Sequence, residues 1–90
     1  MYVIVYADDV VNKDLPIILE PWRSEIRRAI ETKLMTHPEV YSRPLRRSLR
    51  GYRKLRVGAY WIVFRIEESK IKIFVIQHRS TVYDTAPERL

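Results

Sequence analysis

The chain contains no cysteine, which excludes a disulfide framework, a thiolate zinc site and a cysteine nucleophile. Histidine is nearly as scarce. His37 and His78 stand far apart in the sequence and outside any metal-ligand spacing such as HExxH. We therefore expect neither a metal nor another cofactor.

Glycine and long hydrophobic runs are also in short supply. Two glycines in 90 residues argue against a flexible linker or a low-complexity segment. The apolar run at residues 2–6 follows no basic region and is cut off at once by Asp8 and Asp9, unlike a signal peptide or a membrane span. With 47% apolar residues, the sequence predicts one ordered domain over residues 1–90. We expect a cytoplasmic protein with no membrane partner.

Acidic residues are missing from residues 42–56, SRPLRRSLRGYRKLR, which hold seven of the seventeen Lys and Arg residues. Residues 40–90 carry twelve basic and four acidic side chains, a net charge of +8, whereas residues 1–39 carry five and seven, a net charge of −2. A cationic cluster of this kind attracts phosphate backbones and releases counterions on binding. The charge pattern therefore predicts contact with nucleic acid or the ribosome.

The N-terminal half predicts a strand followed by two helices. Residues 2–6 are β-branched or aromatic and favour a strand. Apolar residues at positions 11, 15 and 18 then have helical spacing, although Pro16 interrupts them. A second helix is expected from Pro21 to about His37, where the following proline ends it. Its apolar stripe consists of Trp22, Ile26, Ala29, Ile30 and Leu34.

The C-terminal half favours strands at residues 52–55, 60–66 and 71–77, with a short final strand at 81–83 and a polar tail at 84–90. The short connections predict antiparallel neighbours. In the middle strand, positions 60, 62, 64 and 66 are expected in the core, and positions 61, 63, 65 and 67 on a ligand or solvent face. The chain is thus predicted to be an α+β protein with an N-terminal strand, two helices and a three- to four-stranded antiparallel sheet.

Two short motifs at a characteristic separation carry a family resemblance. Residues 54–60 read KLRVGAY and residues 78–83 read HRSTVY, with two apolar strands and a charged turn between them. In this order the segments resemble the RelE/ParE toxin superfamily. The resemblance implies the toxin of a type II toxin-antitoxin pair that is neutralised by a cognate antitoxin. RelE-like members cleave mRNA in the ribosomal A site, whereas ParE-like members inhibit DNA gyrase.

RNA cleavage by a ribose 2′-OH requires proton removal, stabilisation of a charged phosphorane and protonation of the leaving oxygen, and preplaced cations can replace a metal. The resemblance assigns such chemistry to Lys54, Arg56, Arg79 and Tyr83. Further RNA contacts are expected from Arg46, Arg47, Arg50, Arg53, Trp61, Arg65 and His78.

One departure from the family pattern leaves the activity open. Trp61 stands where many RelE-like members have an arginine directly after the strand tyrosine, so one phosphate contact is missing. A tryptophan can instead stack on a base. The leading hypothesis is a ribosome-dependent, metal-independent mRNA endonuclease. The alternatives are a ParE-like gyrase inhibitor without nuclease activity and a non-catalytic nucleic-acid-binding module.

Overall fold

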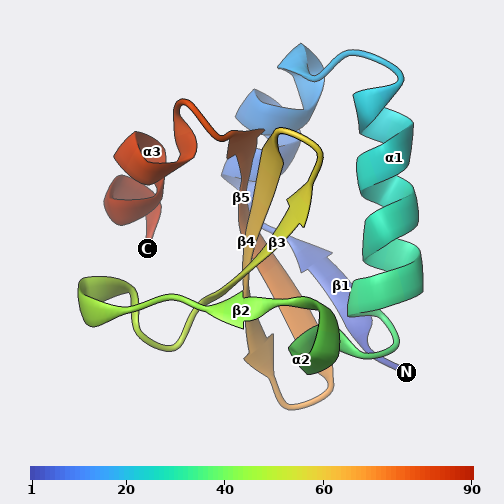
Figure 1. Ribbon diagram of the computed structural model, residues 1–90, viewed down its shortest axis with the longest axis vertical. Helices are drawn as coiled ribbons and strands as arrows, with labels where there is room; N and C mark the ends of the chain where they lie inside the picture. The colour runs from blue at the N-terminus through green and yellow to red at the C-terminus, as the bar shows by residue number, and fades with distance from the viewer.

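Helical segments cover both faces of a central sheet in the computed structural model, which describes all of residues 1–90 (Figure 1). The strands are β1 (Val3–Tyr6), β2 (Arg43–Pro44), β3 (Arg53–Val57), β4 (Tyr60–Glu67) and β5 (Lys70–His78). The helices are α1 (Trp22–Ala29), α2 (Pro38–Tyr41) and α3 (Val82–Arg89). Four short π- or 3₁₀-helical turns are η1 (Val10–Asp14), η2 (Leu15–Ile17), η3 (Ile30–Leu34) and η4 (Arg47–Leu49).

The sheet has five strands in the order β1-β5-β4-β3-β2. Strands β2 to β5 pair antiparallel as the short connections predict, so the expected fold class is confirmed. The structure adds that β1 lies parallel to β5, which makes the sheet mixed. Parallel neighbours need a long crossover, and the helical segments between β1 and β2 belong to it.

The larger core lies between the sheet and the side covered by α1 and the turns η1 to η3. From β4, Ile62 and Phe64 are fully buried in it, while Tyr60 and Ile66 pack at its edge, as their alternation predicts. Helix α1 and turn η3 together form the predicted second helix and contribute its apolar stripe. The buried members of that stripe are Ile26, Ala29, Ile30 and Leu34.

A smaller core lies on the opposite face, beneath α3. It consists of Val63, Val75, Val82 and Ala86. The predicted strand at 81–83 and the polar tail at 84–90 are therefore wrong, because these residues form α3. Val82 and Ala86 are four residues apart and lie on one face of that helix, so their burial overrides the local strand preference.

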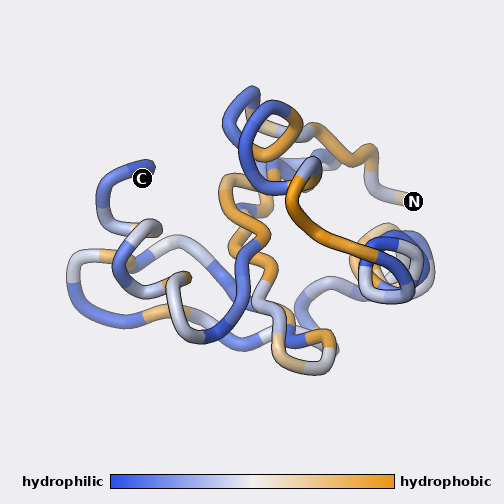
Figure 2. The backbone as a smooth tube through the Cα atoms, turned by 90° about the horizontal axis from the view of Figure 1, so that it is seen from above, coloured by the Kyte–Doolittle hydropathy of each residue, from blue (hydrophilic) through white to orange (hydrophobic).

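The segment at 10–18 forms η1 and η2 instead of one continuous helix, in line with the interruption expected at Pro16. Hydrophobic residues follow the central strands in Figure 2, but the connection from η2 to α1 is also hydrophobic and lies at the surface. Ile17 at the end of η2 and Leu19 in this connection are 75% and 74% exposed. Exposed apolar residues this close together are typical of an interaction surface.

Candidate functional site

An open groove of about 470 Å³ lies between α3 and the segment that contains β2 and η4, with β3 as its floor. It is lined by Arg43, Pro44, Leu45, Arg46, Leu49, Lys54 and Tyr83. Leu45 and Leu49 also line an apolar recess with Val82 and Ala86 of α3. The backbone N–H of Leu45 donates to the carbonyl oxygen of Tyr52 at 2.9 Å, which ties this segment to the chain entering β3.

Lys54 stands at the centre of the groove. Its Nζ donates a hydrogen bond to Oη of Tyr83 at 2.8 Å. The same nitrogen lies 4.6 Å from the ring centre of Trp61 and 5.4 Å from that of Tyr83, within cation–π range. Strands β3 and β4 and the first turn of α3 thus converge on one ammonium group. The structure brings these three predicted residues together.

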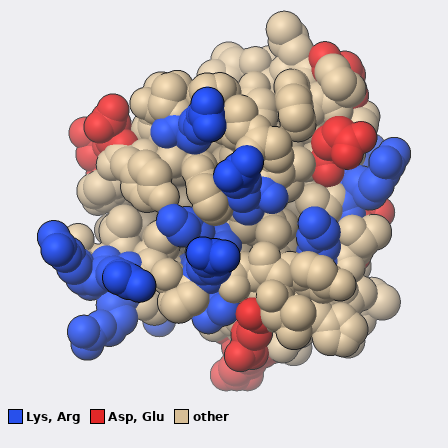
Figure 3. All heavy atoms as spheres, viewed as in Figure 1, with Lys and Arg blue, Asp and Glu red and all other residues tan.

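Two arginines add positive charge beside Lys54. Arg43 of β2 is its direct cross-strand partner, and Arg46 lines the same groove. Neither arginine forms an ion pair, and no acidic side chain lines the groove. Like charges directly opposite each other destabilise a strand pair, so an anion bound between them relieves the repulsion. Figure 3 shows Lys and Arg gathered at the lower left, over the segment of β2 and η4.

Arg43 was missed as a site residue by sequence reasoning. It belongs to the basic segment at 42–56, which was the available signal, but nothing local distinguishes it there. Only the pairing of β2 with β3 places it opposite Lys54.

Two arginines that were predicted to contact RNA bind other residues of the protein and lie outside the groove. Arg53 donates from Nε to Oγ of Ser42 at 2.7 Å and from Nη2 to the carbonyl oxygen of Glu39 at 3.2 Å. These bonds fasten the end of α2 to β3. Arg65 pairs with Glu67 at 3.7 Å and lies 5.7 Å from the ring centre of Tyr52, farther along β4.

Arg47 and Arg50 are exposed on the η4 segment and make no side-chain hydrogen bond or ion pair. Arg47 has a φ of 58°, a left-handed backbone that is uncommon for residues other than glycine. Both guanidinium groups are therefore available to a polyanion at the surface, although neither lines the groove.

Arg56 and Arg79 lie toward the turn between β3 and β4. Arg56 donates from Nε to the carbonyl oxygen of Gly58 at 3.0 Å, and the N–H of Arg79 donates to Ala59 at 2.7 Å. From the strand register, the backbone of Arg79 lies about 13 Å along the strands and about 10 Å across them from that of Lys54. Its exposed side chain makes no hydrogen bond. The structure therefore does not place Arg79 against the Lys54–Tyr83 pair.

His78 lies on the opposite face of the sheet from Lys54. Its ring packs edge-on against Tyr60 at 5.5 Å, on the side of the larger core. Its Nδ1 accepts a hydrogen bond from the N–H of Ser80 at 3.1 Å. These contacts are those of a structural histidine, and the sheet separates His78 from the groove.

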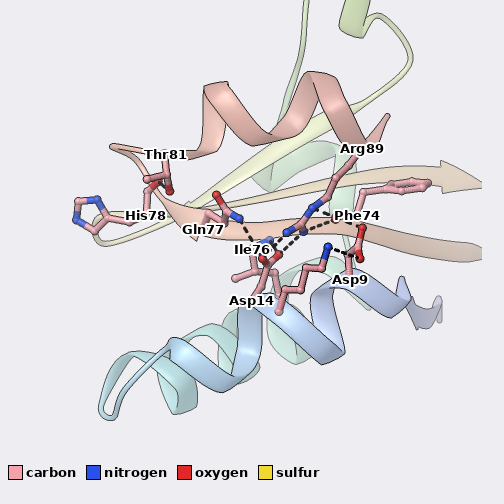
Figure 4. A network of polar contacts seen from close by, with 9 residues as sticks. Asp9, Asp14, Phe74, Ile76, Gln77, His78, Thr81 and Arg89 are labelled. Carbon is pink, nitrogen blue, oxygen red and sulfur yellow. Dashed lines mark hydrogen bonds and ion pairs between the residues drawn. The ribbon is translucent and has the colours of Figure 1, made fainter.

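A buried ion pair that the sequence did not reveal fixes the far end of α3 (Figure 4). Asp14 is 1% exposed and accepts hydrogen bonds from Arg89 Nη1 at 2.7 Å and Nη2 at 2.9 Å. It also accepts from the N–H of Ile76 at 2.8 Å and from Nε2 of Gln77 at 3.1 Å. Hydrogen bonding to Asp14 raises the pKa of Arg89 above its usual range, despite partial burial that acts in the opposite direction.

No three His, Cys, Asp or Glu side chains are grouped closely enough to hold a metal ion. None of the helices has the length and apolar character needed to cross a membrane.

The sequence profile of the family described as ParE toxin of type II toxin-antitoxin system, parDE, matches residues 10–83. No curated protein sequence matches the chain.

Solved structures with this fold include toxins seen in toxin-antitoxin complexes. A chain of the RelBE2 toxin-antitoxin complex from Mycobacterium tuberculosis is similar, with a TM-score of 0.80, 24% identity and coverage of 87% of this chain and 98% of that chain. A chain of the RelB-RelE complex from Methanococcus jannaschii has a TM-score of 0.71 and 24% identity, and the match covers 89% of this chain and 95% of that chain. YafQ from E. coli has a TM-score of 0.59 and 15% identity, and the match covers 92% of this chain and 99% of that chain. At these identities the similarity establishes the fold.

Proposed function

Because the chain belongs to the family of ParE toxins of type II toxin-antitoxin systems, we propose that it is a ribosome-dependent, metal-independent mRNA endonuclease of the RelE kind. The observation that carries this proposal is the hydrogen bond from Lys54 to Tyr83 inside a cationic groove. A polar pair in a groove lined by two arginines offers preplaced cations and a hydroxyl group, which can support 2′-OH attack on phosphate in a protein without a metal.

The groove residues divide the chemistry between them. Arg43, Arg46 and Lys54 stabilise the negative charge that develops on the phosphorane, because their charges are in place before the reaction. Tyr83 Oη accepts from Lys54, which directs the hydroxyl proton of Tyr83 outward, where it can protonate the leaving 5′ oxygen. The ammonium of Lys54 then stabilises the resulting phenolate. Removal of the 2′-OH proton falls to solvent or to a ribosomal group.

Positions outside the groove contribute affinity. Exposed guanidinium groups suit the phosphates on either side of the scissile bond, and they belong to Arg47, Arg50 and Arg79. Arg56 is also exposed, near the turn between β3 and β4, and can contribute in the same way. Trp61 is half-buried against Lys54, so its main effect is to hold that side chain, with stacking on a base limited to its exposed part.

Primer extension on a defined mRNA in a translating extract tests the nuclease proposal. Tyr83→Phe removes the proposed acid but keeps the ring, so the cleavage rate should fall about a hundredfold. Lys54→Met should lower it at least as much. Lys70→Met removes the same charge from the far end of β5 and should leave cleavage unchanged. Cleavage that persists in both Lys54→Met and Tyr83→Phe contradicts the proposal.

A second candidate function is inhibition of DNA gyrase without a nuclease centre. It is favoured by the family profile, which is that of ParE toxins, and by Trp61 at the position of an expected phosphate-binding arginine. A gyrase supercoiling assay separates the two functions. Blocked supercoiling with intact mRNA supports the gyrase inhibitor, and silence in both assays supports a non-catalytic binding module.

We also propose a cognate antitoxin as the protein partner. The similar chains from M. tuberculosis and M. jannaschii occur in toxin-antitoxin complexes. The exposed Ile17 and Leu19 and the cationic groove suit a partner that has an apolar helix and an acidic segment. Co-expression with the product of an adjacent small acidic gene tests this. Co-purification that Ile17→Asp abolishes supports the proposal, and separate elution of the two proteins contradicts it.

A further inference from the structure

Helix α3 carries Tyr83, but little within the helix itself fixes its position. It has eight residues, no side-chain cap at its N-terminus and Pro87 in its interior. An isolated helix of this length is unstable in water, so its tertiary attachments must hold it. Its buried residues are only Val82 and Ala86.

Two polar attachments lie at opposite ends of α3. At the start, Tyr83 is 51% exposed, and its only side-chain hydrogen bond is the one from Lys54. At the end, the side chain of Arg89 is only 12% exposed and binds Asp14 through both terminal nitrogens. The six-residue separation corresponds to about 9 Å of helix, short enough for the helix to move as a rigid rod.

The attachment at Arg89 is much the more strongly determined of the two. Asp14 is bound at once to Arg89, to the backbone of Ile76 and to Gln77, so a carboxylate from η1 joins α3 to β5. Arg89 Nη1 also donates to the carbonyl oxygen of Phe74 at 3.3 Å. A buried carboxylate is tolerated only with such partners, so the pair has essentially one arrangement. The position of α3 is therefore determined at its C-terminal end.

We propose that Asp14 and Arg89 are positioning residues that place the hydroxyl of Tyr83 on Lys54, from the opposite end of α3. Neither residue touches the groove. Their effect passes through the helix, whose orientation over Val63 and Val75 follows the ion pair. The placement of Tyr83 stands independently of the reaction, and only its effect on kcat rests on the nuclease proposed above.

The side chain of Lys54 provides a spectroscopic readout of this placement. Its ε-methylene protons lie beside two aromatic rings, so ring currents should shift their NMR resonance upfield of those of the other lysines. Tyr83→Ala removes one ring and defines the part of the shift that Tyr83 causes. The part due to Trp61 remains as an internal reference.

The main variant is Asp14→Asn/Arg89→Gln in the full chain, which removes both charges and leaves no unpaired buried ion. We expect at least half of the Lys54 shift that Tyr83 causes to be lost. Amide hydrogens of α3 should exchange about tenfold faster or more, while those of β4 and β5 stay protected. Asp9→Asn removes the longer 3.7 Å contact to Arg89 and an exposed ion pair with Lys13 but leaves the Asp14–Arg89 pair in place, so it should change neither signal.

A Lys54 resonance that is unchanged in a folded double variant overturns the proposal, as does equal loss of protection in α3 and the sheet. If the double variant does not fold, Arg89→Lys keeps the charge but loses the two-pronged contact and is judged by the same criteria. If the nuclease is active, kcat should fall with KM unchanged, because the cations of the groove remain. Failure of cleavage in the unmodified protein would contradict the nuclease and leave the NMR result intact.

Discussion

Replacing Gly58 by alanine tests why the KLRVGAY motif contains a glycine. Gly58 has a φ of 60° in the turn between β3 and β4, and a Cβ placed there would collide with the ring of Trp22. The left-handed backbone costs an alanine about 1–2 kcal/mol. Displacing Trp22 also weakens its 5.9 Å ring contact with Tyr60, worth about 0.5–1.5 kcal/mol. We expect a total loss of about 2–3 kcal/mol.

A double-mutant cycle with Trp22→Leu isolates the collision. In the Trp22→Leu background the added methyl group has room, so Gly58→Ala should cost about 1 kcal/mol less, or about 4–8 °C in Tm. Urea unfolding of the four proteins measures this coupling. Gly51→Ala is a useful reference, because Gly51 has a φ of 97° but an added Cβ there meets no atom within 4 Å. It should leave the near-ultraviolet tryptophan signal unchanged. An equal cost of Gly58→Ala in both backgrounds would refute the close approach of Trp22.

Three further outcomes follow from burial and hydrogen bonding. Arg53→Met should cost about 1–3 kcal/mol in urea unfolding, because it removes the hydrogen bonds to the hydroxyl of Ser42 and to the carbonyl oxygens of Glu39 and Ser42. Arg56→Met should stay within about 0.5 kcal/mol, because Arg56 is exposed. Equal effects would contradict the structural role of Arg53. Phe64→Ala should cost about 3–5 kcal/mol through the cavity it leaves, and a loss below half of that would show a loosely packed core. Burial raises the pKa of Tyr6, outweighing the opposite effect of Arg27, so its contribution to stability is complete below pH 10 and is lost as the pH rises toward the folded-state pKa. Phenolate absorbance in wild type and Tyr6→Phe checks this, and ionisation of Tyr6 at or below its usual pKa would contradict it.

Local sequence patterns determined much of the fold. Alternation along residues 60–66 predicted which side chains of β4 enter the larger core, because successive residues of a strand point to opposite faces whatever surrounds them. The apolar stripe from Trp22 to Leu34 predicted a helix, because residues three or four apart lie on the same face of a helix. The motifs at 54–60 and 78–83 indicated the toxin family, which the family profile confirms.

The end of the chain was mispredicted because local preference and tertiary burial disagree there. Val82 and Tyr83 favour a strand on their own, but Val82 and Ala86 can be buried together only on a helix. The spacing of Val82, Ala86 and Leu90 was the available signal, and it is too short to outweigh the β-branched residues before it.

The sequence by itself determined the segregation of charge, the main strands and helix, and the residue types that suit phosphate. Only the tertiary structure decided which of them meet. Strand pairing sets Arg43 opposite Lys54, and Tyr83 reaches Lys54 across 29 positions of sequence. Asp14 finds Arg89 across 75 positions. Such contacts depend on register and on how layers pack, which no local periodicity specifies. His78 and Arg79 show the same limit, because the sheet lies between His78 and the groove, and Arg79 lies beyond the end of β5, away from Lys54.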